Sequence, residues 1–498
     1  MTIPYLSYDA VGLAALIQER QVSARELVEA AFARLDEVNP ILNAVVRTRR
    51  EAALKEADAM PIGDGSRPFA GVPFLLKDIS QAIGGEPLTS GAMLLKHHIA
   101  GRDSNYVDVI RRSGFIPLGH TNTPEFGLKN ITEPVLHGAA RNPWNPAYSP
   151  GGSSGGAAAA VAAGIVPAAG ASDGGGSIRI PAAFTGLFGL KPTRGRTPVG
   201  PGVGRQWQGA SVDFALSRSV RDSAALLDLL QTVQPEAAFQ TPLYPGVYRD
   251  DLYKPQVRKL RIAFTTDSPV GTPVSSEAVQ AVLQTVRWLE AEGHEVEEKL
   301  NPVNGVRLME NYYMMNTGEV AAMFDSLERL TGKPVTAADV DIVTWVLGES
   351  GKKVSAADFV HSLNEWDVAA AHMASLFSRY DFYLSPTNAD SAPKVGQLTQ
   401  TPQETEQLLR VSELSKQEQQ QLIYRMFEPS LTYTPFTQLA NLTGQPAMSV
   451  PVHLTPEGLP LGVQVIGAKG REDLLLQLAA RLEQSPLWVG MKGNPMLA

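Results

Sequence analysis

Ser149-Pro150-Gly151-Gly152-Ser153-Ser154-Gly155-Gly156 is a glycine- and serine-rich stretch, and an alanine-rich segment follows it directly. A second stretch of this kind, Asp173-Gly174-Gly175-Gly176-Ser177, precedes Ile178-Arg179-Ile180-Pro181. Glycine lets backbone N–H groups approach a ligand closely, and a serine at the exit of such a turn can act as a nucleophile beside them. Two such serines between apolar segments are not typical of a linker, and they indicate an active site.

Around these two stretches, short apolar segments alternate with helical patterns. We expect Ser23 to cap a helix together with Glu26, and helices over 48–59, 157–163, 276–292 and 472–484, with residues 305–380 mostly helical. We expect strands over 72–76, 115–119, 165–169, 260–264, 294–298, 382–384, 447–452 and 461–466, the last two forming a hairpin. This alternation predicts an α/β fold: one large domain over residues 1–498 with a central mixed, mostly parallel sheet and helices on both faces.

Composition excludes several classes of function. The 498 residues carry a net charge of −8, and the sequence contains no run of basic residues that would bind nucleic acid. There is no cysteine, so a thiol nucleophile, a thiolate metal site and disulfides are excluded. The eight histidines show no metal-ligand spacing, and we predict no metal site. The N-terminus lacks the order of a signal peptide and no segment is apolar enough to span a membrane, which predicts a cytoplasmic protein.

A serine nucleophile needs a base, and Lys77-Asp78 ends the apolar run that begins at Val72. A lysine accepts a proton only when it is neutral, and burial against Leu75, Leu76 and Ile79 would lower its pKa. A Ser-His-Asp site is an alternative, because Gly151 to Gly155 has the spelling Gly-x-Ser-x-Gly, but it leaves Ser177 and Lys77 unexplained. A phosphate-binding loop is disfavoured because alanine follows Gly156.

Taken together, these motifs resemble the amidase signature family along essentially the whole chain. The resemblance rests on Lys77-Asp78, Gly119 to Phe126, Asn142 to Asn145, Gly151 to Gly156, Asp173 to Pro181, Gly189 to Thr193 and Asn441 to Ala447. Residues 191–196 and 470–477 resemble the 6-aminohexanoate cyclic-dimer hydrolases, which cleave nylon oligomers. The resemblance further implies a core over residues 70–200 and mostly helical variable insertions at about 305–380 and 400–430.

The resemblance implies a role for each site residue. Ser177 would be the nucleophile, Ser153 a bridging serine after a cis peptide bond with Gly152, and Lys77 the base. The backbone N–H groups of the second loop would form an oxyanion hole, and four residues would support the loops, Arg179 also being a candidate contact for an acidic substrate group. The expected oxyanion donors are Gly174, Gly175, Gly176 and Ser177, the expected supporting residues are Gly152, Ser154, Asp173 and Arg179, and the expected pocket residues are Gln206, Trp207, Tyr313 and Asn388.

The expected function is hydrolysis of amide C–N bonds, linear or cyclic, through an acyl-enzyme on Ser177, with carbamates (urethanes) and esters as further substrates. No metal or organic cofactor is expected. The expected partner is a small-molecule amide or carbamate substrate, and the expected oligomeric state is a monomer or homodimer. One alternative is the glutaminase subunit of a tRNA-dependent amidotransferase, which typically carries glutamine where this chain has Ile180. A second alternative, an inactive scaffold of the same fold, is disfavoured by the presence of Lys77, Ser153 and Ser177.

Overall fold

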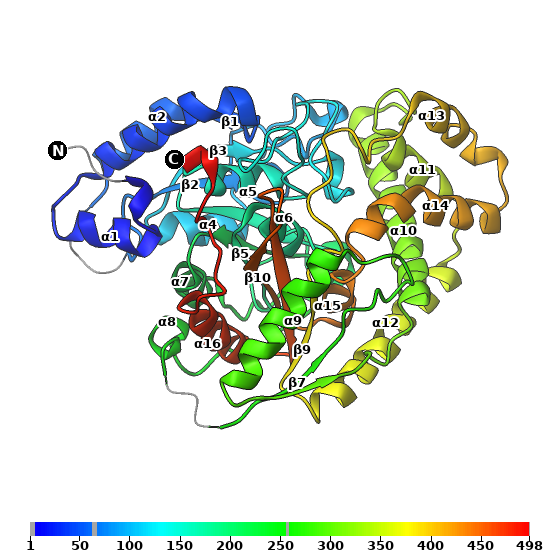
Figure 1. The fold of residues 1–498 in the computed structure, drawn as a ribbon. Helices are drawn as coiled ribbons and strands as arrows, with labels where there is room; N and C mark the ends of the chain where they lie inside the picture. Colours follow the sequence, from blue (N-terminus) through cyan, green and yellow to red (C-terminus); the bar gives the residue numbers. More distant parts are fainter. Residues whose placement is uncertain (1–4, 62–66, 255–257, 498) are drawn as a thin grey trace.

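The computed structural model describes residues 5–61, 67–254 and 258–497, and eleven strands within them form one sheet (Figure 1). The order across the sheet is β1-β3-β2-β4-β6-β5-β10-β11-β9-β7-β8. The strands are β1 Val45–Thr48, β2 Pro73–Lys77, β3 Ile116–Thr121, β4 Ala168–Asp173, β5 Phe188–Lys191, β6 Val212–Ser217, β7 Arg261–Phe264, β8 Glu295–Glu298, β9 Phe382–Pro386, β10 Ala447–Leu454 and β11 Pro460–Gly467.

Helices make up most of the remaining ordered chain. The α-helices are α1 Ala10–Gln18, α2 Ala24–Leu42, α3 Arg50–Asp58, α4 Asn105–Arg112, α5 Gly155–Ala162, α6 Arg179–Thr185, α7 Val220–Leu230, α8 Tyr248–Asp251, α9 Ser276–Ala291, α10 Gly305–Thr331, α11 Ile342–Gly351, α12 Ala356–Phe377, α13 Pro402–Leu408, α14 Lys416–Tyr433, α15 Gln438–Thr443 and α16 Glu472–Glu483. Short 3-10 helices are η1 Tyr5–Ser7, η2 Met93–Leu95, η3 Glu125–Gly127, η4 Gln206–Gly209, η5 Val411–Glu413 and η6 Pro495–Leu497.

Helices cover both faces of the sheet, as predicted. On β11, Gly462 faces Ala183 of α6, whereas Gly467 faces Leu475 of α16 on the opposite side. The predicted cap of α2 is also confirmed, because the Ser23 hydroxyl accepts the backbone N–H of Glu26 and the Glu26 carboxylate accepts that of Ser23. The long apolar and alanine-rich runs therefore belong to elements that are buried between layers.

The sheet is mixed, as predicted, but parallel pairs do not predominate in it. β2 pairs in parallel with β3 and β4, and β7 does so with β8 and β9. The other six pairings are antiparallel, including the expected hairpin of β10 and β11. A strand covered on both faces reads as a continuous apolar run whichever way its neighbours point, so the sequence pattern does not reveal direction.

One shifted strand matters for the site. The strand expected over 165–169 is β4, which begins only at Ala168 and continues to Asp173. Pro167 has no N–H for the ladder, which explains the later start. The extension places Ser172 and Asp173 at the end of a central strand, directly before the glycine-rich loop that carries Ser177. Similarly, the helix expected over 48–59 is shorter, with β1 in front of it.

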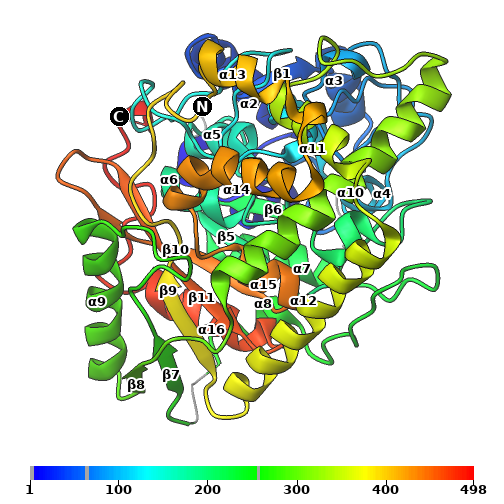
Figure 2. The ribbon, with the colours of Figure 1, turned by 90° about the vertical axis from the view of Figure 1, so that its right-hand side faces the viewer.

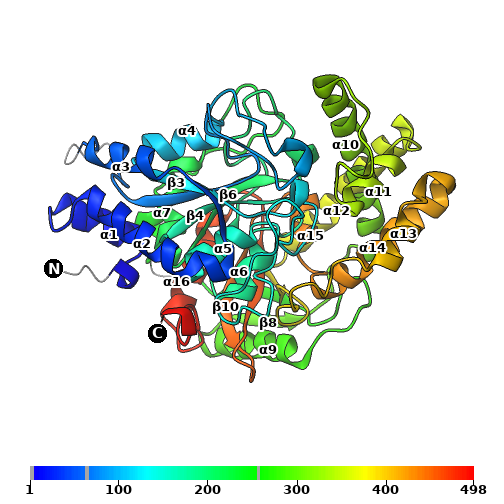
Figure 3. The same ribbon diagram turned by 90° about the horizontal axis from the view of Figure 1, so that it is seen from above.

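Helices α10 to α14 stand together beside the sheet (Figures 2 and 3). Helices α10, α11, α13 and α14 contribute to one apolar cluster, which includes Val320 and Phe324 of α10, Leu347 of α11 and Ile423 of α14, whereas α12 packs on α10 through a second cluster with Trp366 and Ala369. We refer to these five helices as the helical block. The ranges 305–380 and 400–430 are thus mostly helical, and that they are variable within a family stays a prediction.

Candidate active site

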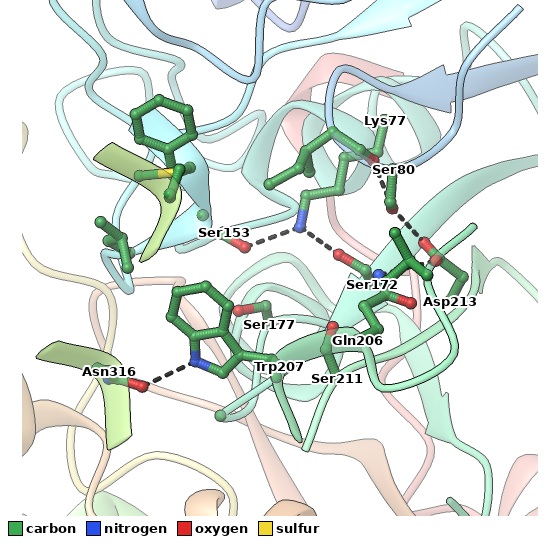
Figure 4. A pocket seen from close by; sticks show the side chains of 18 of the residues that line it. Lys77, Ser80, Ser153, Ser172, Ser177, Gln206, Trp207, Ser211, Asp213 and Asn316 are labelled. Carbon is green, nitrogen blue, oxygen red and sulfur yellow. Dashed lines mark hydrogen bonds between the residues drawn. The ribbon is translucent and has the colours of Figure 1, made fainter. Parts of the chain in front are cut away.

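Lys77 is the last residue of β2, between β3 and β4 in the sheet, and its side chain is completely buried. Its Nζ donates hydrogen bonds to the Ser153 Oγ at 2.7 Å and to the Ser172 Oγ at 2.9 Å (Figure 4). Burial disfavours the ammonium and lowers the pKa of Lys77 to about 7, although the charges of Asp213 and Asp173 act in the opposite direction. Near neutral pH a large fraction of this amine can therefore accept a proton.

Ser153 is held by the loop that precedes α5. The Gly152–Ser153 peptide bond is cis, and the Ser153 carbonyl accepts a hydrogen bond of 2.9 Å from the Thr123 hydroxyl. Gly152 packs so tightly that a Cβ there would lie 2.7 Å from the carbonyl oxygen of Ile131. Ser154 connects the two serine loops, because its hydroxyl donates to the Ser172 carbonyl and its N–H donates to the Ser177 carbonyl. A side chain at Gly152 would therefore displace the bridging position.

The loop that carries Ser177 is organised by a buried carboxylate. Asp173 accepts the N–H of Gly176 at 2.7 Å on Oδ1 and the N–H of Ile178 at 3.2 Å on Oδ2. Arg179 donates to both oxygens at 2.9 Å, and despite its burial the carboxyl of Asp173 has a pKa lowered to about 2 through this partner. The loop is thus fixed by an ion pair that has no contact with solvent.

Arg179 has no capacity left for a substrate. All five of its N–H groups donate inside the protein, and its side chain is completely buried. The acceptors are both Asp173 oxygens, the Thr437 carbonyl, the Gln464 side chain and the Asn441 side chain. The suggested contact of Arg179 with an acidic substrate group is therefore corrected to a purely structural role.

Hydrogen bonds within the second loop engage one of the expected oxyanion donors. Of the four expected oxyanion donors, Gly176 has its N–H engaged by Asp173, whereas no hydrogen bond within the described residues engages the N–H groups of Gly175 and Ser177. The carbonyls of Gly174 and Gly175 accept hydrogen bonds from the hydroxyls of Tyr312 and Thr437, at 3.0 and 2.7 Å. These contacts come from the helical block and from the segment before α15, so distant parts of the chain set the loop's conformation.

Lys77, Ser153, Ser172 and Ser177 all line one cavity of about 560 Å³ between the sheet and the helical block. Figure 4 shows the side chains of Ser153 and Ser177 in the same part of this cavity. Within residues 5–61, 67–254 and 258–497, no hydrogen bond joins their two hydroxyls. The wall is largely apolar, with side chains from η3, α10 and α14 among others: Ile79, Leu88, Phe126, Leu128, Met309, Met323, Phe427 and Leu431.

Three of the four expected pocket residues line this cavity, namely Gln206, Trp207 and Tyr313. Trp207 is oriented by a hydrogen bond of 2.7 Å from its indole N–H to the Asn316 side chain. Asn388 does not line the cavity. It is completely buried after β9, where its Nδ2 donates to the Ile180 carbonyl at 3.2 Å, so it supports α6 from behind.

Several residues around the site were not expected from the sequence. Ser172 is the second hydrogen-bond partner of Lys77, and the buried carboxyl of Asp213 on β6 accepts from the Ser80 hydroxyl at 2.7 Å and from the Gln206 amide at 3.0 Å. The position of Ser172, directly before Asp173, was the one available signal. Asp213 carries no local motif, because it reaches the site only through the fold.

None of the helices described outside the gaps at 1–4, 62–66, 255–257 and 498 is long and apolar enough to cross a membrane. The same part of the chain contains no group of three or more histidine, aspartate or glutamate side chains with the arrangement of a metal site.

Comparison with known proteins gives a consistent result. The family model described as Amidase matches residues 26–476. A lipoamidase of Enterococcus faecalis is 42% identical over 483 residues, which cover 97% of this chain but 64% of that protein, so the chain spans less than two thirds of this relative. A 6-aminohexanoate-cyclic-dimer hydrolase of Paenarthrobacter ureafaciens is 35% identical over 97% of this chain and 96% of its own. A structure of 6-aminohexanoate cyclic dimer hydrolase complexed with substrate superposes with a TM-score of 0.90 at 34% identity, covering 99% of this chain and 100% of that one.

Proposed function

Because the chain belongs to the amidase family, we propose that it is a serine hydrolase that cleaves amide C–N bonds through an acyl-enzyme on Ser177. The observation that carries this proposal is the buried amine of Lys77, 2.7 Å from the Ser153 hydroxyl and with a pKa of about 7, in the cavity that Ser177 also lines. A neutral amine can donate to Ser172 while it accepts a proton from Ser153.

In the proposed reaction, a rotation of the Ser177 side chain brings its hydroxyl to Ser153. The proton of Ser177 passes to Ser153 as the proton of Ser153 passes to Lys77, and the Ser177 oxygen bonds to the substrate carbonyl carbon. The negative charge that forms on the carbonyl oxygen is stabilised by the N–H groups of Gly175 and Ser177, with Gly174 as a further expected donor.

The same relay runs in reverse to complete the cycle. The C–N bond breaks as the leaving nitrogen takes the proton from Lys77 through Ser153, and the acyl group stays on Ser177. Water then gives its proton to the relay and adds to the acyl carbon, which releases the carboxylic acid and restores the Ser177 hydroxyl. These steps use side chains, backbone N–H groups and water alone.

The substrate class is a small molecule with an amide bond and a largely apolar body. The apolar wall of the cavity supports this, as do the names of the relatives, lipoamidase and 6-aminohexanoate-cyclic-dimer hydrolase. Carbamates and esters belong to the same proposal, since the acyl-enzyme chemistry accommodates them. We propose a cytoplasmic monomer or homodimer without nucleic-acid or membrane partners, which chromatography coupled to light scattering and cell fractionation would test.

The two alternatives are not favoured. The relatives that share most of their length with this chain are named as amide hydrolases, and Ile180, rather than glutamine, lines the cavity. An inactive scaffold is disfavoured because the three relay residues are present and line one cavity.

The test is a panel of p-nitroanilides, carbamates and esters assayed with the purified full chain. A fluorophosphonate should label Ser177, identified by mass spectrometry of the labelled peptide, and Ser177→Ala should abolish both labelling and turnover while keeping the fold. Labelling on another residue, or full turnover by Ser177→Ala, would refute the proposal.

A further inference from the structure

One side chain that lines the cavity has an acceptor atom without a partner among the described residues. Gln438 is the first residue of α15 and is 8% exposed. Its Nε2 donates to the Thr434 carbonyl at 2.9 Å, and its Oε1 is buried without a hydrogen bond from any described residue. Gln438 lines the same cavity as Ser177 and Lys77.

The orientation of this amide is fixed by its neighbour. The Thr434 carbonyl can only accept, so the amide nitrogen must face it and a flipped amide would bring two acceptors together. Gln438 is also anchored from the other side, because the adjacent Thr437 donates its hydroxyl to the Gly175 carbonyl and accepts from Arg179 on its own carbonyl. The free oxygen is therefore held in one position relative to the Ser177 loop.

Nearby donors of the wall are already engaged. The Trp207 indole donates to Asn316, the Tyr312 hydroxyl donates to Gly174, and the Thr434 hydroxyl donates to the Ser430 carbonyl. A buried acceptor without a partner is unfavourable, so a ligand that supplies a donor at this point gains affinity and one that does not is penalised.

The donor should be neutral. Asp103 and Asp213 are the acidic residues of the cavity wall within the described chain, and both are engaged, Asp103 with Arg111 at 2.8 Å and Asp213 with Ser80 and Gln206. An ammonium group beside Gln438 would lose its hydration without gaining a counter-charge. An amide N–H has no such penalty.

We infer that Gln438 is a specificity-determining residue, whose Oε1 accepts a hydrogen bond from a neutral N–H of the substrate outside the scissile amide. The substrate is then an otherwise apolar molecule with a second N–H group. This inference rests on the proposed amide hydrolysis, but its test can be separated from that of the reaction.

The probes are p-nitroanilides with a second secondary amide in the acyl chain, at graded distances from the scissile bond, each paired with an isostere in which CH2 replaces that N–H. A second set carries the additional amide on the amine side, with product release followed by chromatography. Within each pair the molecules differ by one donor and have nearly equal volume.

Binding is measured by calorimetry on full-length Ser177→Ala, which does not depend on turnover. In at least one pair, the amide should bind about tenfold more tightly than its isostere. Adding Gln438→Leu should bring the ratio close to one. Gln419→Leu is the matched control, since Gln419 is also buried, donates its Nε2 to a backbone carbonyl, that of Val411, at 2.8 Å, and leaves its Oε1 unpartnered, but does not line the cavity. Gln419→Leu should keep the preference.

Equal affinity within every pair, or a preference that survives Gln438→Leu, would overturn the inference. Failure of the wild-type chain to release p-nitroaniline from any of the probes would instead count against the proposed hydrolysis, while the calorimetric ratio would still decide the role of Gln438.

Discussion

The hydroxyl of Tyr312 donates a hydrogen bond of 3.0 Å to the carbonyl oxygen of Gly174. Tyr312 belongs to α10 of the helical block, and Gly174 begins the loop that carries Ser177. A peptide unit is planar, so a contact that holds the Gly174 carbonyl also fixes the direction of the Gly175 N–H. The helical block thereby orients one of the proposed oxyanion donors.

Tyr312→Phe should therefore impair the chemical step more than binding. We expect kcat to fall about tenfold while KM changes by less than about twofold, because the pocket loses one oxygen and the loop becomes less well fixed. Steady-state kinetics on a p-nitroanilide check this, and thermal unfolding verifies the fold. Tyr424→Phe, on α14 and outside the cavity wall, is the control and should leave both constants in place. Unchanged kcat in Tyr312→Phe would contradict the positioning role.

The relay residues should act as one unit. Ser153→Ala and Lys77→Ala should each lower kcat by at least about two orders of magnitude, and the double variant should be little worse than either, because either change interrupts the same proton path. The wild type and the three variants are compared by single-turnover kinetics. If the two losses are additive, Ser153 and Lys77 work independently and the proposed path is wrong.

Sequence alone indicated the centre of the site, because its residues stand in two glycine-rich loops and at the end of one apolar run. Ser153, Ser177 and Lys77 were identified in this way, as were the helices on both faces of the sheet. Asp213 was not, because it reaches the site through the pairing of β6 with β4 and has no motif around it. The engaged N–H of Gly176 was equally hidden, since it depends on the exact path of the loop.

A similar limit applies to the segments that suggested a subgroup. Residues 191–196 and 470–477 contact each other: Arg196 forms an ion pair with Glu472 at 3.2 Å, and the N–H of Thr193 donates to the same carboxylate. Both side chains of the ion pair are buried, and none of the three residues lines the cavity. These segments therefore report on packing, whereas Trp207 and Gln438, which we propose to select the substrate, line the cavity.

Loss of Arg179 should mainly affect stability. Arg179→Ala would leave Asp173 buried without its partner, which typically costs about 3–5 kcal/mol in the free energy of unfolding. The urea midpoint, followed by circular dichroism, should fall accordingly. Arg25→Ala serves as the comparison, because Arg25 pairs with Glu29 and Asp58 at the exposed surface and should leave the midpoint nearly unchanged. Equal effects of the two changes would contradict the structural role of the buried pair.

The pH dependence of kcat/KM should reflect Lys77. The amine accepts a proton only in its neutral form, so activity should be low below the pKa of about 7 and rise through it with increasing pH. Lys77→Arg should be inactive across the range, since a guanidinium stays protonated. Burial also lowers the pKa of Lys191 to about 7, but this residue donates to the Pro192 carbonyl and does not line the cavity. Lys191→Met should therefore keep the rising limb. Loss of the limb in this variant would mean that the limb reports the titration of Lys191 and not that of Lys77.

Asp213 should determine where that limb lies. Its carboxylate raises the pKa of Lys77, because a nearby negative charge stabilises the ammonium against the larger effect of burial. Asp213→Asn removes the charge while keeping the size of the side chain, so the pKa of Lys77 should fall and the rising limb of kcat/KM should move to lower pH. Ser80→Ala removes one of several hydrogen bonds that favour the charged form of this carboxyl but leaves the carboxyl in place, so it should shift the limb less than Asp213→Asn does. A limb that stays in place in Asp213→Asn would mean that the carboxyl of Asp213 carries no charge beside Lys77, and that burial, opposed by the charge of Asp173, sets the pKa of the base.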